Sequence, residues 1–116
     1  MKITDFYSYK KPGWKISMIT AYDSTLAALA AESEVDCVLV GDSLAMVMHG
    51  HGSTIAATVD LMALHTEAVA RAVKGKLVVA DMPFLSVRKG LEPAMEAVEK
   101  LARAGAQAVK IEGLEG

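Results

Sequence analysis

Short apolar runs alternate along the chain with longer stretches whose apolar residues recur every three to four positions. Continuous runs rich in Val, Ile and Leu are typical of strands buried on both faces, and the longer spacing is typical of helices packed against such strands. The pattern predicts strands at 16–22, 37–40, 76–81 and 107–112. It predicts helices at 24–32, 59–73 and 93–104, and it makes 3–9 a candidate for a short extra helix.

The predicted elements follow one another in the order strand, helix, strand, helix. Parallel strands must be joined by long crossover connections, usually helices, and these helices then cover the sheet. The Ala104-Gly105 pair after the last predicted helix is typical of a helix end, because glycine often follows the final helical residue. The sequence therefore predicts an α/β fold with a parallel sheet, in a chain whose 116 residues suffice for one small domain.

The amino-acid composition indicates which kinds of binding partner to expect. The chain has 12 Lys and Arg against 14 Asp and Glu, a formal net charge of -2, with the basic residues scattered along it. This pattern gives no cluster of basic residues of the kind that binds nucleic acid or an anionic membrane. No apolar run is long enough to span a bilayer, and the opening MKITDFYSYKK lacks the apolar segment of a signal peptide, so we expect a cytoplasmic protein. The single cysteine, Cys37, opens an apolar run and is expected to be a buried structural thiol.

Each predicted strand ends in polar residues, where parallel α/β folds gather their ligand sites. These residues are Tyr22-Asp23, Asp42-Ser43, Asp81, and Lys110 with Glu112. Because strand side chains alternate between faces, we expect Lys110 and Glu112 to share one face. The same rule places Asp81 with Val79 and Asp42 with Val40. If helices cover the opposite face, the three carboxylates of Asp42, Asp81 and Glu112 converge.

Such a convergence has a chemical consequence. Two like charges about 4 Å apart repel by about 4 kcal/mol at an effective dielectric of about 20, so the trio must take up protons or bind a cation. Oxygen ligands without Cys or His partners favour Mg²⁺ over Zn²⁺. Lys110, beside Glu112, would then supply a positive charge for the carboxylate or keto oxygen of an anionic substrate.

Simpler explanations exist for several polar residues. An Asp directly after a strand is commonly a helix N-cap or a turn residue. We expect Asp23 to be an N-cap, and for Asp42 the N-cap or turn role stays open beside the metal role. His65, inside a predicted helix, is interpreted as structural. His49 and His51 have no carboxylate or cysteine at ligand spacing nearby, so they are interpreted as loop residues.

Five segments taken together resemble one known family. They occur in order and with compatible spacing over nearly the whole chain: MITAYDSTLAALAAE, VLVGDSLAMVMHGHGST, LHTEAV, VVADMPF and AGAQAVKIEG. The sequence is similar to the 3-methyl-2-oxobutanoate hydroxymethyltransferase (ketopantoate hydroxymethyltransferase) family. The resemblance implies a (βα)8 TIM barrel, of which 1–116 would be the amino-terminal half with roughly four βα units. Two small departures are Ala45, where the family commonly has Gly, and the loop LSVRKGLEPA.

The family's functional positions carry over residue by residue. Its GDS motif matches Gly41-Asp42-Ser43, which implies that Asp42 ligates Mg²⁺ and that Asp42 and Ser43 contact the 2-oxo acid. Asp81, in the D-[ML]-P-F motif, would bind both metal and substrate. In the VK[IL]EG motif, Lys110 would bind the substrate and Glu112 the metal.

The resemblance also implies an activity. The reaction is hydroxymethyl transfer from 5,10-methylenetetrahydrofolate to 3-methyl-2-oxobutanoate through a Mg-stabilised enolate, giving 2-dehydropantoate for pantothenate synthesis. The general base, a Glu on a later strand, is expected beyond Gly116, so no catalytic base is assigned within the chain, which alone is expected to be inactive. Expected partners are the 2-oxo acid, the folate, the other half of the barrel and further copies in a homo-oligomer. The alternatives are another Mg-dependent 2-oxo acid barrel enzyme, of lyase or phosphonomutase type, and a non-catalytic fragment that needs its other half.

Overall fold

The computed structural model describes residues 15–83, 86 and 88–111, and within them the chain forms a four-stranded parallel sheet. Its strands are β1 (Met18–Thr20), β2 (Cys37–Val40), β3 (Leu77–Asp81) and β4 (Ala108–Lys110). The strands lie in the order β1-β2-β3-β4, so each pairs with the next one along the chain. This arrangement confirms the predicted α/β class and parallel sheet.

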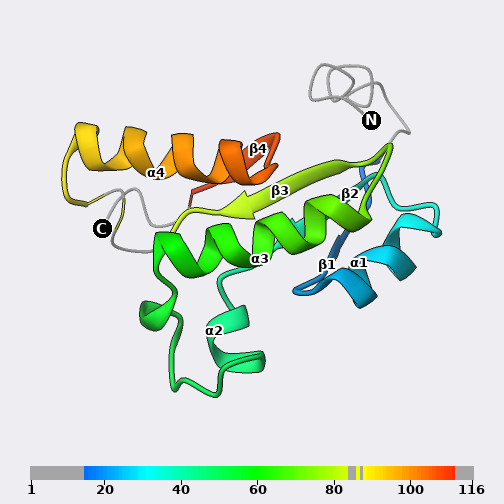
Figure 1. Cartoon of the computed structure of the whole chain (residues 1–116), viewed down its shortest axis with the longest axis horizontal. Coiled ribbons are helices and arrows are strands. Elements are labelled where there is room, and N and C mark those ends of the chain that lie inside the picture. The colour runs from blue at the N-terminus through cyan, green and yellow to red at the C-terminus, as the bar shows by residue number, and fades with distance from the viewer. Residues whose placement is uncertain (1–14, 84–85, 87, 112–116) are drawn as a thin grey trace.

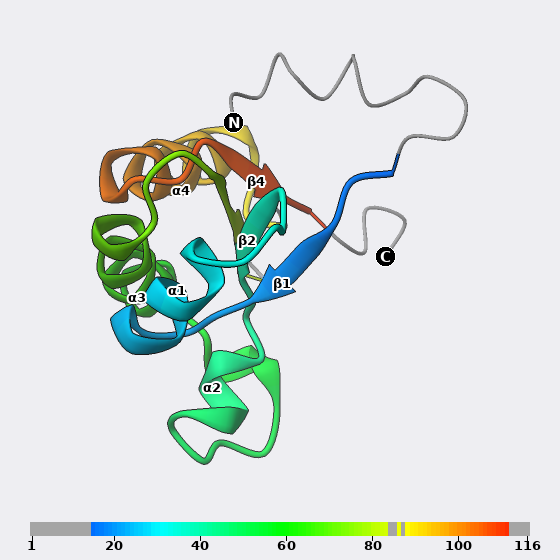
Figure 2. The same ribbon diagram turned by 90° about the vertical axis from the view of Figure 1, so that its right-hand side faces the viewer.

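Three helices cover one side of the sheet. They are α1 (Ser24–Ala31), α3 (Val59–Ala72) and α4 (Leu91–Ala104). Figure 1 shows α3 and α4 lying along the sheet, and Figure 2 shows all three helices on the same side of it. A short helix, α2 (Leu44–Val47), and a 3-10 turn, η2 (Thr54–Ala56), lie in an excursion between β2 and α3 that extends away from the sheet (Figure 1). Among the described residues, no helix is both long and apolar enough to cross a membrane.

Side-chain caps fix where two of these helices begin. The Asp23 carboxylate accepts a hydrogen bond from the backbone N–H of Leu26 at 2.8 Å, which confirms its predicted N-cap role. The Thr58 hydroxyl accepts from the N–H of Leu61 at 3.1 Å at the start of α3. Each cap satisfies one of the backbone donors that the first turn of a helix leaves unpaired.

The sheet has two different faces. One packs under the helices in the main apolar core, which includes Val38, Val40, Val78, Ala80, Met62, Val69 and Leu101. The other carries a smaller cluster of Cys37, Leu77 and Val79, with Leu39 and Ala108 packed against it. We call this second face, which the helices leave uncovered in Figure 2, the inner face. By strand alternation it also includes Asp81 and Lys110.

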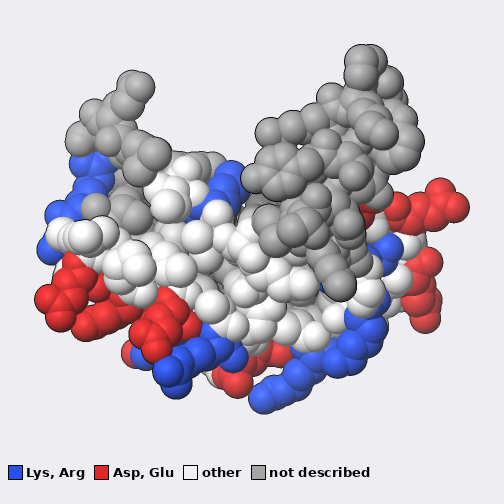
Figure 3. All heavy atoms as spheres, turned by 90° about the horizontal axis from the view of Figure 1, so that it is seen from above, with Lys and Arg blue, Asp and Glu red and all other residues white. Residues whose placement is uncertain are grey.

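Charged residues occupy the outward surfaces of the helices. Ion pairs join Glu67 to Arg71 at 3.5 Å within α3 and Glu99 to Arg103 at 2.7 Å within α4. A third pair, between Asp60 and Lys100, links α3 to α4. Figure 3 shows acidic and basic side chains intermixed along one side of the molecule, whereas the centre of that view is mostly uncharged. These ion pairs therefore lie on the helical side of the molecule.

The structure differs from the sequence prediction mainly at element ends. The first and last strands are shorter than predicted, because regular pairing is confined to Met18–Thr20 and Ala108–Lys110. The helix α2 and the 3-10 turn η2 were not predicted, since elements of three or four residues are too short to show a period. The candidate helix at 3–9 lies outside the described residues.

Gly105 allows α4 to end against α3. Its φ of 120° lies in the region that L-residues rarely adopt, and a Cβ there would lie 2.5 Å from the Ala70 Cβ. We expect Gly105→Ala to lower the free energy of unfolding by at least about 1 kcal/mol, measured by urea denaturation of the full-length protein. Gly75→Ala is the control, because Gly75 has a φ of 83° but a Cβ added there would meet no atom within 4 Å. Equal losses in the two variants would contradict a steric role for Ala70.

Cys37 is fully buried on the inner face, as predicted. Burial raises the pKa of its thiol above the ordinary value of 9.0, and the neighbouring Asp36 carboxylate raises this pKa further. Because the thiolate is the reactive form, we expect thiol reagents to label Cys37 slowly in the native protein and fully in urea, as followed by peptide mass spectrometry. The neutral thiol's contribution to stability is complete below the unfolded pKa and is lost as the pH rises through the folded value. Rapid native labelling at neutral pH would contradict this burial.

Candidate active site

Asp81 is the most strongly constrained polar residue at the strand ends. It closes β3 and is only 7% exposed. Its Oδ2 accepts a hydrogen bond from the backbone N–H of Asp42 at 2.9 Å. Its Oδ1 is buried and receives no hydrogen bond from the described part of the chain. Buried carboxylate oxygens normally have hydrogen-bond partners, whereas the charged group beside this oxygen is the Lys110 ammonium, 3.5 Å away, so Oδ1 keeps the capacity to accept a further ligand such as a cation.

Lys110 lies beside Asp81 on the inner face. The two residues are register partners in the β3–β4 pair, so their side chains leave the sheet on the same side. The Nζ of Lys110 lies 3.5 Å from Oδ1 of Asp81, and the lysine side chain is 41% exposed. The structure thus brings these two opposite charges together at neighbouring strand ends. The arrangement places a positive charge next to a buried carboxylate at the open side of the sheet.

The alternation predicted for β2 holds, because Val38 and Val40 share one face, but the prediction that this face points inward was wrong. Val38 and Val40 pack in the core under the helices, not on the face that carries Asp81. The strand's regular period ends at Val40, and the residue that continues the inner face is Gly41. A Cβ on Gly41 would lie 3.4 Å from Ser43 Oγ and 3.6 Å from Asp81 Oδ2. Asp42 follows in a turn, where alternation no longer decides the direction of its side chain.

Two hydroxyls tie the end of β1 to the start of α2. The oxygen atoms of Tyr22 and Ser43 lie 2.7 Å apart. Ser43 occupies the N-cap position of α2, but its side chain makes no capping hydrogen bond there. Tyr22 also packs against the main core. The Ser43 hydroxyl is therefore held near the Asp81 carboxylate by a residue from another strand end.

The predicted site is only partly described. Asp42 is half-buried in the turn before α2, and its backbone N–H rather than its carboxylate makes the contact with Asp81. Glu112 lies outside the described residues. Within the described ranges, no three His, Cys, Asp or Glu side chains gather as a metal-binding group. The convergence of Asp42, Asp81 and Glu112 stays a prediction, whereas the Asp81–Lys110–Ser43 neighbourhood is observed.

The structure pairs two histidines that the sequence placed separately, in a loop and in a helix. Nε2 of His49 lies 2.9 Å from Nε2 of His65, and Nδ1 of His65 lies 2.6 Å from the Tyr22 carbonyl oxygen. No local spacing could have signalled this pair, because the two residues are far apart in the sequence and meet only through tertiary folding. His49 therefore contacts α3 through His65, in addition to its place in the loop.

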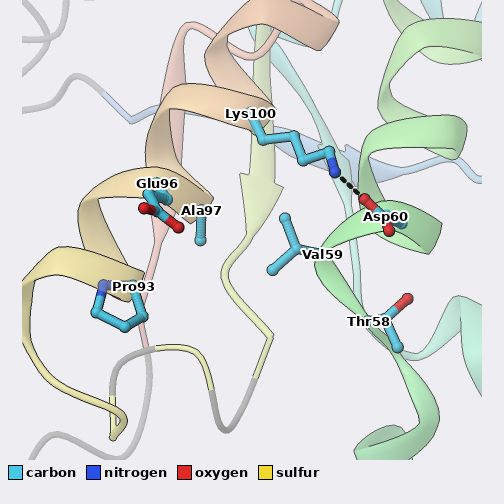
Figure 4. A pocket seen from close by; sticks show the side chains of 7 residues that line it. All are labelled: Thr58, Val59, Asp60, Pro93, Glu96, Ala97 and Lys100. Atoms are coloured by element: carbon cyan, nitrogen blue, oxygen red, sulfur yellow. Dashed lines mark hydrogen bonds and ion pairs between the residues drawn. The ribbon is translucent and has the colours of Figure 1, made fainter.

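A separate hollow lies on the helical side, between the first turn of α3 and the first three turns of α4. It has a volume of about 290 Å³ and is lined by Thr58, Val59, Asp60, Pro93, Glu96, Ala97 and Lys100. Figure 4 shows the Asp60–Lys100 ion pair crossing from one helix to the other beside it. Its lining shares no residue with the strand-end cluster around Asp81, so it is not part of the candidate active site.

The fold and the strand-end cluster define the class of protein to which the chain belongs. Four sequential parallel strands, the first three each followed by a helix on one side, with polar residues at the strand ends, form part of a (βα)8 barrel. The chain superimposes on phosphoenolpyruvate phosphomutase from Streptomyces platensis subsp. rosaceus with a TM-score of 0.75 at 22% identity, over 96% of this chain and 38% of that one. It superimposes on a 2,3-dimethylmalate lyase of the PEP mutase/isocitrate lyase superfamily with a TM-score of 0.69 at 20% identity, over 93% and 39% of the two chains. These likenesses establish the barrel fold.

The chain belongs to the ketopantoate hydroxymethyltransferase family, whose model matches residues 1–116. It is 54% identical over 113 residues to 3-methyl-2-oxobutanoate hydroxymethyltransferase of Coxiella burnetii, covering 97% of this chain and 42% of that protein. It is 54% identical over 114 residues to the protein of the same name from Bdellovibrio bacteriovorus, covering 98% and 43% of the two. The chain thus spans less than half the length of the curated relatives that it matches.

Proposed function

We propose that the full-length protein transfers a hydroxymethyl group from 5,10-methylenetetrahydrofolate to 3-methyl-2-oxobutanoate, giving 2-dehydropantoate for pantothenate synthesis. The observation that carries this proposal is 54% identity, over 97% of the chain, to a relative named for this hydroxymethyltransferase activity. The buried Asp81 carboxylate, with Lys110 beside it, supports the proposal because the acceptor is a small anionic 2-oxo acid.

The donor set fits a hard divalent cation. Asp81 and Asp42, with Glu112, are proposed to hold Mg²⁺, and the buried Oδ1 of Asp81 that lacks a hydrogen bond is the observation that favours this role. A bound Mg²⁺ would supply Lewis-acid polarisation of the substrate carbonyl. Phosphonopyruvate hydrolase, which has the same fold with a TM-score of 0.73 at 15% identity, was solved with oxalate and Mg²⁺, so the fold is compatible with such ligands.

The remaining side chains orient the 2-oxo acid. Lys110 is partly exposed and ion-paired to Asp81, so its ammonium can meet the substrate carboxylate without a large change in burial. The Ser43 hydroxyl, held by Tyr22, offers a hydrogen bond at a fixed position near Asp81. Together these groups would hold the acid in one orientation.

The proposed reaction breaks the C3–H bond and forms a bond from C3 to the methylene carbon of the folate. The methylene carbon leaves both folate nitrogens, water supplies the hydroxyl oxygen, and tetrahydrofolate is released. A general base must accept the C3 proton, and we propose that a Glu on a later strand of the full-length protein is this base. The described residues would therefore bind and orient the substrate, while the later part of the barrel would complete proton transfer.

Proton exchange tests this function most directly. With full-length protein in D₂O, we expect the C3 proton of 3-methyl-2-oxobutanoate to exchange when Mg²⁺ is present and to stop exchanging with excess chelator, as followed by NMR. Product should form only after 5,10-methylenetetrahydrofolate is added. Absence of both exchange and product from a folded, metal-loaded protein would reject the proposal.

A second candidate is a Mg-dependent lyase or phosphonomutase acting on a related 2-oxo acid. The fold likeness to phosphoenolpyruvate phosphomutase and to 2,3-dimethylmalate lyase favours it. This alternative would be favoured if the protein cleaved a carbon–carbon bond of a 2-oxo acid, or interconverted phosphoenolpyruvate and phosphonopyruvate. The C3 proton of 3-methyl-2-oxobutanoate would then not exchange.

The open sheet makes the rest of the barrel a necessary partner in the proposal. On β1, the side chains of Met18 and Ile19 are 46% and 43% exposed. Apolar strands with an unpaired edge tend to associate. We expect the 116-residue chain alone to form oligomers or aggregates and to lack activity. A monodisperse monomer by light scattering, with a cooperative thermal transition, would show that this half needs no partner.

A further inference from the structure

The His49–His65 pair links three segments near the candidate active site. His65 is a half-buried residue of α3, and His49 is an exposed residue just after α2. Their rings meet edge to face, with centroids 5.1 Å apart and an interplanar angle of 84°. The other nitrogen of His65, Nδ1, lies 2.6 Å from the carbonyl oxygen of Tyr22, at the end of β1. One side chain thus contacts the end of a strand and the α2–η2 excursion.

The partners of His65 assign its tautomer. A carbonyl oxygen can only accept, so Nδ1 of His65 must carry the proton in its contact with Tyr22. A neutral imidazole has a single N–H, which leaves Nε2 of His65 as an acceptor. The facing Nε2 of His49, 2.9 Å away, must then be the donor. The order of donation runs from His49 to His65 and from His65 to Tyr22.

Tyr22 extends this chain of contacts to the substrate side. Its carbonyl is held by His65, and its phenol oxygen lies 2.7 Å from the Ser43 hydroxyl. Ser43 in turn lies next to the position that a Gly41 Cβ would occupy, close to Asp81. Because misplacement of a reacting group by about 1 Å can cost about 100-fold in rate, fixing both ends of Tyr22 has functional value.

We propose that His65 is a positioning residue with two roles. Through its contact with the Tyr22 carbonyl, it holds the Tyr22–Ser43 pair beside Asp81. Through His49, it fastens the α2–η2 excursion to α3. The first half of this inference rests on the proposed function, because it assigns Ser43 to the 2-oxo acid. The second half rests only on the hydrogen bonds of His65. His65 acts through other residues and does not itself touch the reacting atoms.

A transition-metal site is the competing explanation for two facing histidines. Two nitrogen ligands of one tetrahedral Zn²⁺, each about 2.0–2.1 Å from the ion, lie about 3.3 Å apart. The observed separation of 2.9 Å suits a hydrogen bond better. Within the described ranges, no third His, Cys, Asp or Glu completes a metal-binding group. The geometry therefore favours the hydrogen-bonded pair.

Kinetics of full-length variants test the positioning role. We expect His65→Ala to lower kcat/KM for 3-methyl-2-oxobutanoate about 10- to 100-fold, the range typical of losing a residue that orients a ligand-contacting group. His65→Asn should recover most of this loss, because the Asn amide N–H can take the place of Nδ1–H toward Tyr22. His49→Ala, which spares that contact, should lower kcat/KM less than His65→Ala. Equal losses in His65→Ala and His65→Asn, measured well below their unfolding temperatures, would overturn the role.

A double-mutant cycle tests the route through Tyr22. Tyr22→Phe removes the hydroxyl that contacts Ser43. If His65 acts through Tyr22, His65→Ala should cost much less in the Tyr22→Phe background than in the wild type. Independent, additive losses would overturn the route. If wild-type protein shows no exchange at C3, the proposed function fails at that step, and the hydrogen-bond assignment is then judged by spectroscopy alone.

NMR of the ring nitrogens is the activity-independent measurement. At mildly alkaline pH, where imidazoles in water are neutral, His65 should show a protonated Nδ1 and a bare Nε2, and His49 a protonated Nε2. Hydrogen exchange of the backbone amides at 48–53 should accelerate in His65→Ala. The opposite His65 tautomer, unchanged exchange at 48–53, or stoichiometric shifts of both rings on adding Zn²⁺ to apoprotein would each overturn the pairing.

Discussion

Replacement of Asp81 by Asn is expected to abolish the Mg²⁺-dependent exchange of the C3 proton in the full-length protein. An Asn side chain keeps an oxygen that can accept the Asp42 N–H bond now made at 2.9 Å, so the turn should survive. It removes the negative charge that faces Lys110 at 3.5 Å and that would bind the cation. Loss of a residue that hydrogen-bonds to a metal ligand typically lowers metal affinity or activity about 10- to 100-fold. Loss of the ligand's own charge should therefore lower the exchange rate by more than about 100-fold.

Two measurements separate this effect from unfolding. Calorimetric titration with Mg²⁺ should show weakened binding, and the circular dichroism spectrum should match that of the wild type. Asp60→Asn is the control, because Asp60 is an acidic residue on α3 whose side chain is 78% exposed and lies outside the strand-end cluster. We expect it to leave exchange within about twofold of the wild type, as for most exposed substitutions. Undiminished exchange in Asp81→Asn would remove Asp81 from the site.

Leu101→Ala is expected to give the largest loss of stability among the substitutions considered. Leu101 is fully buried where α4 packs on the sheet, in the same core as Val78 and Ala80. Truncation of a buried Leu to Ala costs about 2–5 kcal/mol, through lost transfer free energy and the cavity that remains. The free energy of unfolding of the full-length protein should fall by that amount, measured from urea transitions.

The matched control lies on the same helix. Leu91, the first residue of α4, is 78% exposed, so Leu91→Ala removes little buried area. We expect a change within about 0.5 kcal/mol for it. A comparable loss in both variants would mean that α4 is not fastened to the sheet through Leu101.

Much of the site could be predicted because it depends on strand ends. The polar residues that close β3 and β4 are visible in the sequence, and strand alternation correctly placed Asp81 and Lys110 on one face. The same rule grouped Asp42 with Val38 and Val40, whose face packs under the helices instead of pointing inward. It does not extend to Asp42, because the chain leaves β2 after Val40 and turns at once toward α2. Alternation is a property of paired strands and carries no information into a turn.

The sequence by itself determined the order of elements, the parallel α/β class and the family. These follow from local hydrophobic periods and from ordered motifs, which need no knowledge of distant contacts. Only the tertiary structure decided which groups meet: the Tyr22 and Ser43 hydroxyls, the His49 and His65 rings, and the Asp81 carboxylate with the Asp42 backbone. Each of these contacts joins residues at least 16 positions apart, and their distances are set by how the helices and strands pack rather than by any local pattern.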